Sequence, residues 1–519
     1  MSMDITAVAI FIALFLCVTL LGFVAGRWRR GDLTQLHEWG LGGRRFGTVV
    51  TWFLLGGDLY TAYTFVAVPA LLFGAGATGF FAVPYTIMVY PLLFLVFPRL
   101  WSVAKAKGYV TAADFVRGRF GSSTLALAIA VTGIVATMPY IALQLVGMEV
   151  VIAGLGIPLS VTIPGLGPVP DAPLFIAFIV LAAFTYTSGL RAPAMIAVVK
   201  DALLYITVFA AIIFIPAKLG GYAKIFASID PKTLLLGAAT PGNLGPQAAY
   251  ATLALGSTLA LFLYPHAMTG LLSSSSRHVV RRNAVILPAY SFALGLIALL
   301  GYMAVAAGVK AMPAYADGFK AFGNNFAVPA LFLQMFPSWF VGLAFAAIAV
   351  GALVPAAIMS IACANLFTRN IFKEYIQPNC SHERECQVAK LVSLFIKSGA
   401  LFFVIELPTQ YAIQLQLLGG IWIIQTLPSV LLGLYTRRLH PAALLIGWAV
   451  GIAAGTAMAA EMSFKSSIFP LHILGTIVPC YAAVSSLLLN IAVSAGLSWL
   501  FNALALKSGA DATLAEDYV

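Results

Sequence analysis

Charged residues are scarce in this chain, and the common motifs of hydrolytic enzymes are absent. Asp, Glu, Lys and Arg together make up 9% of the 519 residues, whereas hydrophobic residues make up 61%. A soluble globular domain could not bury that much apolar surface. The sequence contains no phosphate-binding loop, catalytic triad or zinc-protease motif, so we do not expect an enzyme that draws energy from nucleotide hydrolysis.

Cysteine is also rare, with five residues spread along the chain. Cys380 and Cys386 flank a polar stretch, but their spacing matches no standard zinc pattern. The sequence therefore predicts neither a metal site nor a prosthetic cofactor.

Apolar stretches recur along the whole sequence, and each is long enough to span about 30 Å of hydrocarbon. The first one lacks the basic start and the small-residue cleavage site of a secretory signal, so we expect it to be retained. The sequence predicts an all-α integral membrane protein with 13 spans, at 5–26, 47–73, 78–98, 123–154, 172–190, 195–217, 248–273, 284–309, 337–368, 389–407, 411–436, 440–461 and 473–505.

The distribution of basic residues predicts the orientation. With the N-terminus outside, 22 of the 29 Lys and Arg residues fall in inside segments, 6 fall outside, and Lys397 lies within a span. Such a bias is typical of cytoplasmic loops. We therefore expect a bacterial-type inner membrane protein with a cytoplasmic C-terminus. Topology explains the net charge of +11 without a nucleic acid partner.

An aspartate, Asp58, lies near the middle of the second predicted span, directly after Gly56 and Gly57. A carboxyl group at membrane depth is costly unless it is neutral, paired or facing a polar cavity. Two glycines permit an unwound backbone. A broken helix that carries an ionisable group at this depth is typical of a transport site.

A second polar interruption, Gly256-Ser257, lies five spans later. Because a repeat with an odd number of spans must be inverted, this spacing predicts a core of spans two to six plus seven to eleven. Spans one, twelve and thirteen would be peripheral. The alternative is that these glycines only allow close helix packing. The predicted division of the chain is 1–46, 47–217, 218–436 and 437–519.

Four stretches, in order along the predicted topology, resemble motifs of one transporter family. They are YVTAADFVRGRF at 109–120, YTSGLRA at 186–192, Lys200-Asp201, where family members usually show Thr-Asp, and LFTRNIF at 366–372. On these residues the chain resembles the sodium/solute symporter family over about residues 5–500. The resemblance implies a LeuT-type 5+5 inverted-repeat fold, alternating access and uptake driven by a cation gradient.

Within that family the chain looks most like the bacterial monocarboxylate permease branch. The stretches behind this likeness are YPHAMTG at 264–270, VPAAIMS at 354–360 and LPTQY at 407–411. This likeness implies lactate, pyruvate, propionate, acetate or alanine as substrate. Another small organic solute, such as an amino acid or a pantothenate-like compound, is the alternative.

The chain departs from the family at the expected sodium site. The resemblance implies that members bind sodium through two backbone carbonyls of span two and a pair of serine hydroxyls in span nine. Here the serine pair falls on Val354 and Pro355, downstream of Gly351, and none of these side chains carries an oxygen. A hard cation needs several oxygen ligands to replace its water. The departure argues against the usual sodium coupling.

Ionisable residues near the same site suggest a replacement. An ammonium group can occupy the space of a bound cation and supply its charge. Buried amines and carboxyl groups can also load and release protons. We therefore hypothesise proton coupling through Asp58, Lys200 and Asp201, with sodium coupling as the alternative.

Each of these residues also has a structural interpretation. Lys200 could extend to the headgroups from the inner part of its span. Asp201 could form a purely structural pair with Lys200 or Arg191, and Asp58 could make a structural polar contact. Lys397 could pair with Asp58 or extend to the inner surface.

A carboxylate substrate would fit the exposed N–H groups of a broken helix, where the helix dipole is positive. His266 could titrate there or act in packing. The predicted substrate-binding residues are Gly56, Gly57, Tyr60, Tyr63, Thr64, Tyr140, Gln144, Gly256, Ser257 and Tyr264.

A membrane sensor and a channel are the two other classes of membrane protein to compare with a transporter. A sensor would be expected to carry a signalling domain, whereas only a short polar tail, 502–519, follows the last span. The broken repeats argue against a channel.

Overall fold

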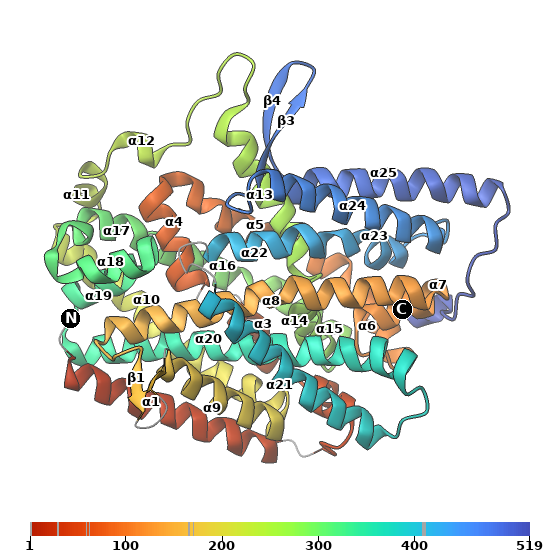
Figure 1. Ribbon diagram of the computed structural model, residues 1–519, viewed down its shortest axis with the longest axis horizontal. Helices are drawn as coiled ribbons and strands as arrows, with labels where there is room; N and C mark the ends of the chain where they lie inside the picture. Colours follow the sequence, from red (N-terminus) through yellow and green to blue (C-terminus); the bar gives the residue numbers. More distant parts are fainter. Residues whose placement is uncertain are drawn as a thin grey trace.

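The computed structural model describes residues 3–28, 31–58, 60–61, 63–163, 167–169, 171–406 and 412–519. Long helices run along the longest axis of the molecule (Figure 1). Among the described residues, nine helices are long and apolar enough to cross a membrane, or ten if one bent pair counts as a single span. The chain begins at one end of this axis and finishes toward the other (Figure 1), which fits an odd number of crossings.

Predicted spans two to six all correspond to helices. The fourth span matches its predicted limits, because Ser122 caps its first turn by accepting a hydrogen bond from the Leu125 N–H. The helices of this half are α3 (Thr48–Gly57), α4 (Val68–Ala75), α5 (Ala82–Leu95), α6 (Phe97–Ala106), α7 (Ala112–Phe120), α8 (Ser123–Gly154), α9 (Ala172–Ser188) and α10 (Arg191–Leu219).

The second half opens with a bent pair, α13 and α14, whose axes differ by 48°. Two short helices, α11 (Tyr222–Ala227) and α12 (Pro231–Leu234), precede it in the predicted outside segment. The helices of this half are α13 (Gly245–Leu261), α14 (Pro265–Leu272), α15 (Arg277–Ile286), α16 (Pro288–Ala298), α17 (Leu300–Ala306), α18 (Ala316–Phe322), α19 (Ala327–Met335), α20 (Ser338–Phe367), α21 (His382–Glu406), α22 (Ala412–Ile423) and α23 (Leu427–Val430).

Burial separates central from peripheral helices. In α20, 94% of the apolar stretch is buried, against 28% for the first span and 33% for each of the last two. The peripheral helices are α1 (Ile5–Val24), α24 (Pro441–Glu461) and α25 (Ala482–Ala503), with the short α2 (Leu36–Leu41) after the first. This order of burial agrees with the predicted core and periphery, whereas the exact division of the chain stays a prediction.

The start of the thirteenth predicted span is wrong. Residues 473–481 belong instead to an antiparallel hairpin of β3 (Ile468–Ile473) and β4 (Thr476–Tyr481), and α25 begins only at Ala482. Leu474 and Gly475 form its turn, both with positive φ, the geometry that reverses two twisted strands. The hairpin projects from the helices (Figure 1), and a shorter pair, β1 (Val161–Ile163) and β2 (Gly167–Val169), follows α8.

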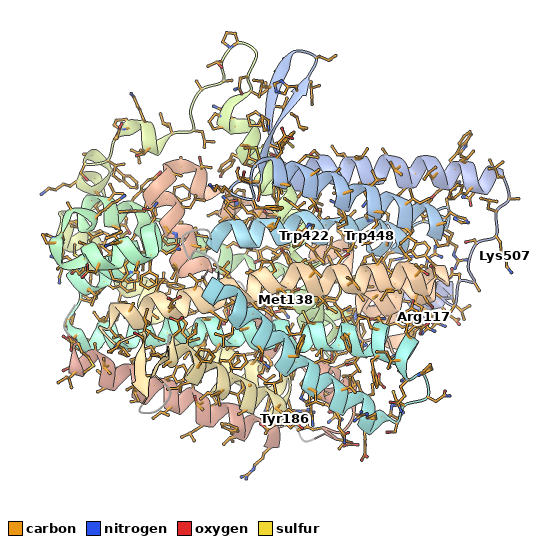
Figure 2. The ribbon with its side chains drawn as sticks, viewed as in Figure 1. Arg117, Met138, Tyr186, Trp422, Trp448 and Lys507 are labelled. Atoms are coloured by element: carbon orange, nitrogen blue, oxygen red, sulfur yellow. The ribbon has the colours of Figure 1, made fainter. Side chains whose placement is uncertain are left out.

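Basic residues predicted on the inside gather at one end. Figure 2 places Arg117 and Lys507 together at the end of the helices where the chain finishes. There Arg119 connects the chain's last segment to the bundle: it donates to the carbonyls of Gly433 (3.0 Å) and Thr436 (2.8 Å) and to the carboxylate of Asp511 (2.7 Å).

Replacement of Arg119 by alanine should destabilise the protein. It leaves two backbone carbonyls and a carboxylate without their donor, at a cost of about 1–3 kcal/mol for each group that stays dry. Thermal unfolding in detergent, followed by fluorescence, measures the effect. Arg437→Ala is the control, because this exposed side chain lies 3.7 Å from the same Asp511 carboxylate. Its loss should change stability by less than about 0.5 kcal/mol. Equal effects of the two variants would contradict the structural role of Arg119.

Candidate functional site

The second predicted span is broken directly after its two glycines. The helix α3 ends at Gly57, Asp58 is its C-cap, and helical structure resumes as a π-turn at Tyr63–Ala67. Gly56 packs under the ring of Tyr290, where an ideal Cβ would lie 2.0 Å from a ring carbon. No other residue type fits beneath that ring, so this contact requires the glycine.

The ammonium group of Lys200 fills the break from the side of α10. Its Nζ lies 2.5 Å from the Gly57 carbonyl oxygen, 3.0 Å from that of Tyr60 and 2.9 Å from Oδ1 of Asp201. Lys200 and Asp201 are both fully buried. The lysine does not extend to the headgroups, which removes that alternative.

Asp201 is fixed by a second contact. The Tyr290 hydroxyl donates to its Oδ2 at 2.8 Å, and the Tyr60 hydroxyl donates to the Tyr290 carbonyl at 3.0 Å. Arg191 binds the backbone and carboxylate of Glu38 instead, so the alternative pair of Arg191 with Asp201 does not form.

The helix α20 forms the opposite wall of this site. An ideal Cβ on Gly351 would lie 3.8 Å from the Tyr60 carbonyl oxygen, the same oxygen that accepts from Lys200. Val354 and Pro355 follow one turn later on the same face and are buried. The wall beside the ammonium therefore carries no hydroxyl at these three positions.

Asp58 faces a histidine across the two broken spans. Nε2 of His266, in the first turn of α14, lies 3.3 Å from Oδ2 of Asp58, and both side chains are buried. Among the described residues, neither ring nitrogen of His266 nor Oδ1 of Asp58 has a hydrogen-bond partner. Lys397 does not pair with Asp58; it donates to the Ser393 hydroxyl at 2.9 Å.

Two tyrosines surround the imidazole. The ring centroids of Tyr140 and Tyr264 each lie 5.3 Å from that of His266. The Tyr264 hydroxyl donates to the backbone carbonyl of Gln416 in α22 at 3.1 Å. The amide oxygen of Gln416 is buried and has no hydrogen-bond partner among the described residues, so this residue joins the site although sequence reasoning missed it. A glutamine in an apolar span was the available signal.

The second helix break does not lie at Gly256-Ser257, where the sequence predicted it. The helix α13 continues through Gly256 and Ser257 to Leu261, and the chain breaks at 262–264, before Pro265. Proline lacks an N–H and disfavours a helical conformation in the residue before it, here Tyr264 with ψ 136°. Gly256 instead accommodates Tyr481, whose Cδ1 would lie 2.5 Å from an ideal Cβ.

For three of the predicted substrate residues, the structure gives only a local hydrogen bond or the position of the backbone. Thr64 accepts a hydrogen bond from the Thr61 N–H at 3.4 Å, and the Gln144 amide donates to the Tyr140 carbonyl at 3.3 Å. The backbone of Tyr63 opens the π-turn, but its side chain lies outside the described part of the structure. Residues 407–411, which supported the permease likeness, also lie outside it.

Comparison with known proteins assigns the chain to a family. The family model described as the sodium:solute symporter family matches residues 39–451. The chain belongs to the sodium:solute symporter family. This confirms the resemblance inferred from the sequence motifs.

Two relatives are similar to this chain over most of their length. A protein of Rhizobium johnstonii named monocarboxylate transport permease protein is 54% identical over 504 residues, covering 95% of this chain and 97% of its own. The uncharacterised symporter YodF of Bacillus subtilis is 32% identical and covers 87% of this chain and 88% of its own.

A solved structure shows the same fold. A Na+-coupled sialic acid symporter in a substrate-bound outward-open state matches with a TM-score of 0.73 at 16% identity, covering 96% of this chain and 98% of the other. The all-α LeuT-type architecture that the family resemblance implied is thus confirmed. In the present protein, the break of α3 is occupied by the side chain of Lys200.

Gly56→Ala tests the packing of the break. Because the new methyl group would overlap the Tyr290 ring, we expect a lower thermal midpoint and at least a tenfold loss of substrate uptake. The double variant Gly56→Ala with Tyr290→Ala should recover stability in part, since the ring is then gone. Gly47→Ala is the matched control, because nothing lies within 4 Å of its ideal Cβ. An unchanged Gly56→Ala protein would show that the break tolerates a side chain.

Proposed function

We propose that this protein imports a small monocarboxylate by proton-coupled symport, with the Lys200 ammonium in the place of a sodium ion. One observation carries the proposal: Lys200 Nζ is held by three oxygens at 2.5–3.0 Å, two of which are backbone carbonyls of the broken span. The family resemblance implies that carbonyls of this span bind sodium in other members.

The chemistry of the wall supports the same proposal. An ammonium group has three N–H donors, and the three oxygens around Nζ match that number. A sodium ion beside it would meet a like charge, and Gly351, Val354 and Pro355 supply no hydroxyl to coordinate the ion. A tethered cation thus makes a mobile one unnecessary at this place.

Two lines of support concern the substrate. The 54% identical relative is named a monocarboxylate transport permease, which favours lactate, pyruvate, propionate, acetate or alanine over larger solutes. The site holds a buried imidazole, two tyrosines and an amide near two helix breaks, a set suited to one carboxylate and a small apolar body. We place the transporter in an inner membrane with its N-terminus outside.

Proton coupling needs buried groups that exchange protons. Asp58, Lys200 and Asp201 are the buried candidates for this exchange, and ionisable residues at membrane depth commonly form proton relays.

Uptake into proteoliposomes tests this function. With radioactive lactate or pyruvate in a sodium-free external buffer, an imposed inward proton gradient should drive accumulation in the vesicles. A protonophore should abolish this accumulation. A sodium gradient at equal pH should give no more uptake than protein-free liposomes. Uptake that follows external sodium at fixed pH would refute proton coupling and favour the sodium-coupled alternative.

Lys200→Met tests the substitute cation. It should abolish accumulation, and it leaves the buried Asp201 carboxylate without its cation, at a cost of about 3–5 kcal/mol. The double variant Lys200→Met with Asp201→Asn removes both charges and should regain thermal stability without regaining accumulation. Lys218→Met, on the same helix, is the matched control and should transport normally. Normal accumulation by the stable double variant would exclude a role for Lys200 in coupling.

A further inference from the structure

The two broken spans meet at one buried pair of ionisable side chains. Asp58 closes α3, His266 opens α14 just after Pro265, and Oδ2 and Nε2 are 3.3 Å apart. Asp58 is 7% exposed and His266 1%. The pair thus lies where both helices present free backbone ends, at the position where transporters of this architecture bind substrate and coupling ions.

Several polar atoms of this pair are not satisfied by the part of the protein that the structure describes. Oδ1 of Asp58 and both ring nitrogens of His266 lack a hydrogen-bond partner in the described structure, as does the nearby amide oxygen of Gln416. Leaving a buried polar group unpaired costs about 1–3 kcal/mol, and such groups are rare without a functional reason. Several of them in one place indicate a site that a polar ligand completes.

Charge distinguishes the two carboxylates of the site. Asp201 has a fixed cation in Lys200 at 2.9 Å and a donor in Tyr290. Nζ of Lys200 already has its three oxygens, so Asp58 is the carboxylate that lacks a dedicated cation. A second carboxylate entering beside a charged Asp58 would be repelled in a medium of low dielectric constant.

The other titratable groups around the pair do not remove this repulsion. Lys200 and Asp201 face it from α10, Tyr140 from α8, and Tyr264 and Tyr85 from the second break and α5. The packed helix α20 carries a single ionisable residue, Cys363. A neutral tyrosine or thiol contributes no positive charge, and the lysine and Asp201 balance one another.

We infer that Asp58 and His266 form the proton-linked carboxylate subsite of the transporter: a proton on Asp58 permits binding, and the imidazole donates a hydrogen bond to the substrate carboxylate. This inference rests on the proposed proton symport. One proton accompanies one carboxylate, so the loaded site carries no added charge. Lys200 and Asp201 remain a fixed pair and do not carry the proton.

The same pair provides a release step. A cavity of about 20 Å³, the size of one water molecule, adjoins the first turns of α14 and is lined by Pro265, Met268 and Thr269 together with Gly133 and Ala362. When the site opens to solvent, Asp58 gives up its proton to water. The carboxylate of Asp58 then regains its charge and repels the substrate anion.

The test combines binding and transport in three proteins. In the wild type, the dissociation constant for lactate should rise about tenfold per pH unit on the alkaline side, since one proton is linked to binding. Asp58→Asn should bind with a constant independent of pH and keep lactate exchange across the membrane, yet lose proton-driven accumulation at least tenfold. His266→Gln should weaken binding about tenfold or more at every pH, with exchange and accumulation falling together.

Controls keep the outcomes separate. Asp317→Asn and His278→Gln remove exposed residues of the same types and should behave as wild type. Asp58→Ser replaces Asp58→Asn if the latter does not elute as a monodisperse protein. A pH dependence of the lactate dissociation constant that persists in the Asp58 variant overturns the inference, because the protein would then bind protonated lactic acid itself. Binding of lactate by His266→Gln with the wild-type affinity also overturns it. Sodium-driven uptake by the wild type would instead refute the proposed function, and so the two failures differ.

Discussion

The bond between the Lys200 ammonium and the backbone of the broken α3 is the contact on which the rest of the site depends. A helix that stops in the middle of a membrane leaves carbonyl groups that lipid cannot satisfy. Here a side chain from α10 satisfies those of Gly57 and Tyr60. The break and the lysine therefore require each other, and the positive charge is supplied by the fold.

This contact fixes the neighbouring groups. Asp201 balances the lysine, Tyr290 donates to Asp201, and the ring of Tyr290 can reach it only because Gly56 has no side chain. The Tyr60 hydroxyl then donates to the Tyr290 backbone. The result is a closed arrangement of Lys200, Asp201, Tyr290 and Tyr60, in which Oδ1 of Asp201 meets the ammonium as an ion pair and Oδ2 accepts from Tyr290.

Asp58 stands in contrast to that arrangement, although it is one residue away from Gly57. Its partner is a histidine whose ring nitrogens, like Oδ1 of Asp58 itself, find no hydrogen-bond partner among the described residues. Two carboxylates in one site thus have different environments, which is how a single fold separates a structural charge from an exchangeable one. Symport requires such a difference, because the group that binds the ion must also be able to release it.

The sequence by itself determined the membrane class, most of the spans, the first break and the family, because these depend on apolar length, on glycine beside a mid-span aspartate and on local motifs. It also placed Lys200 and Asp201 near Asp58. Only the tertiary structure decided that Lys200 reaches the carbonyls instead of the headgroups, that Asp58 faces His266 and not Lys397, and that Gln416 joins the site. The second break lies before Pro265 and not at Gly256, where the sequence predicted it. A glycine within a helix can serve packing equally well, as Gly256 does against Tyr481. These contacts join residues more than a hundred positions apart, and periodicity or motif spacing carries no information about which side chains the folded helices bring within hydrogen-bonding distance.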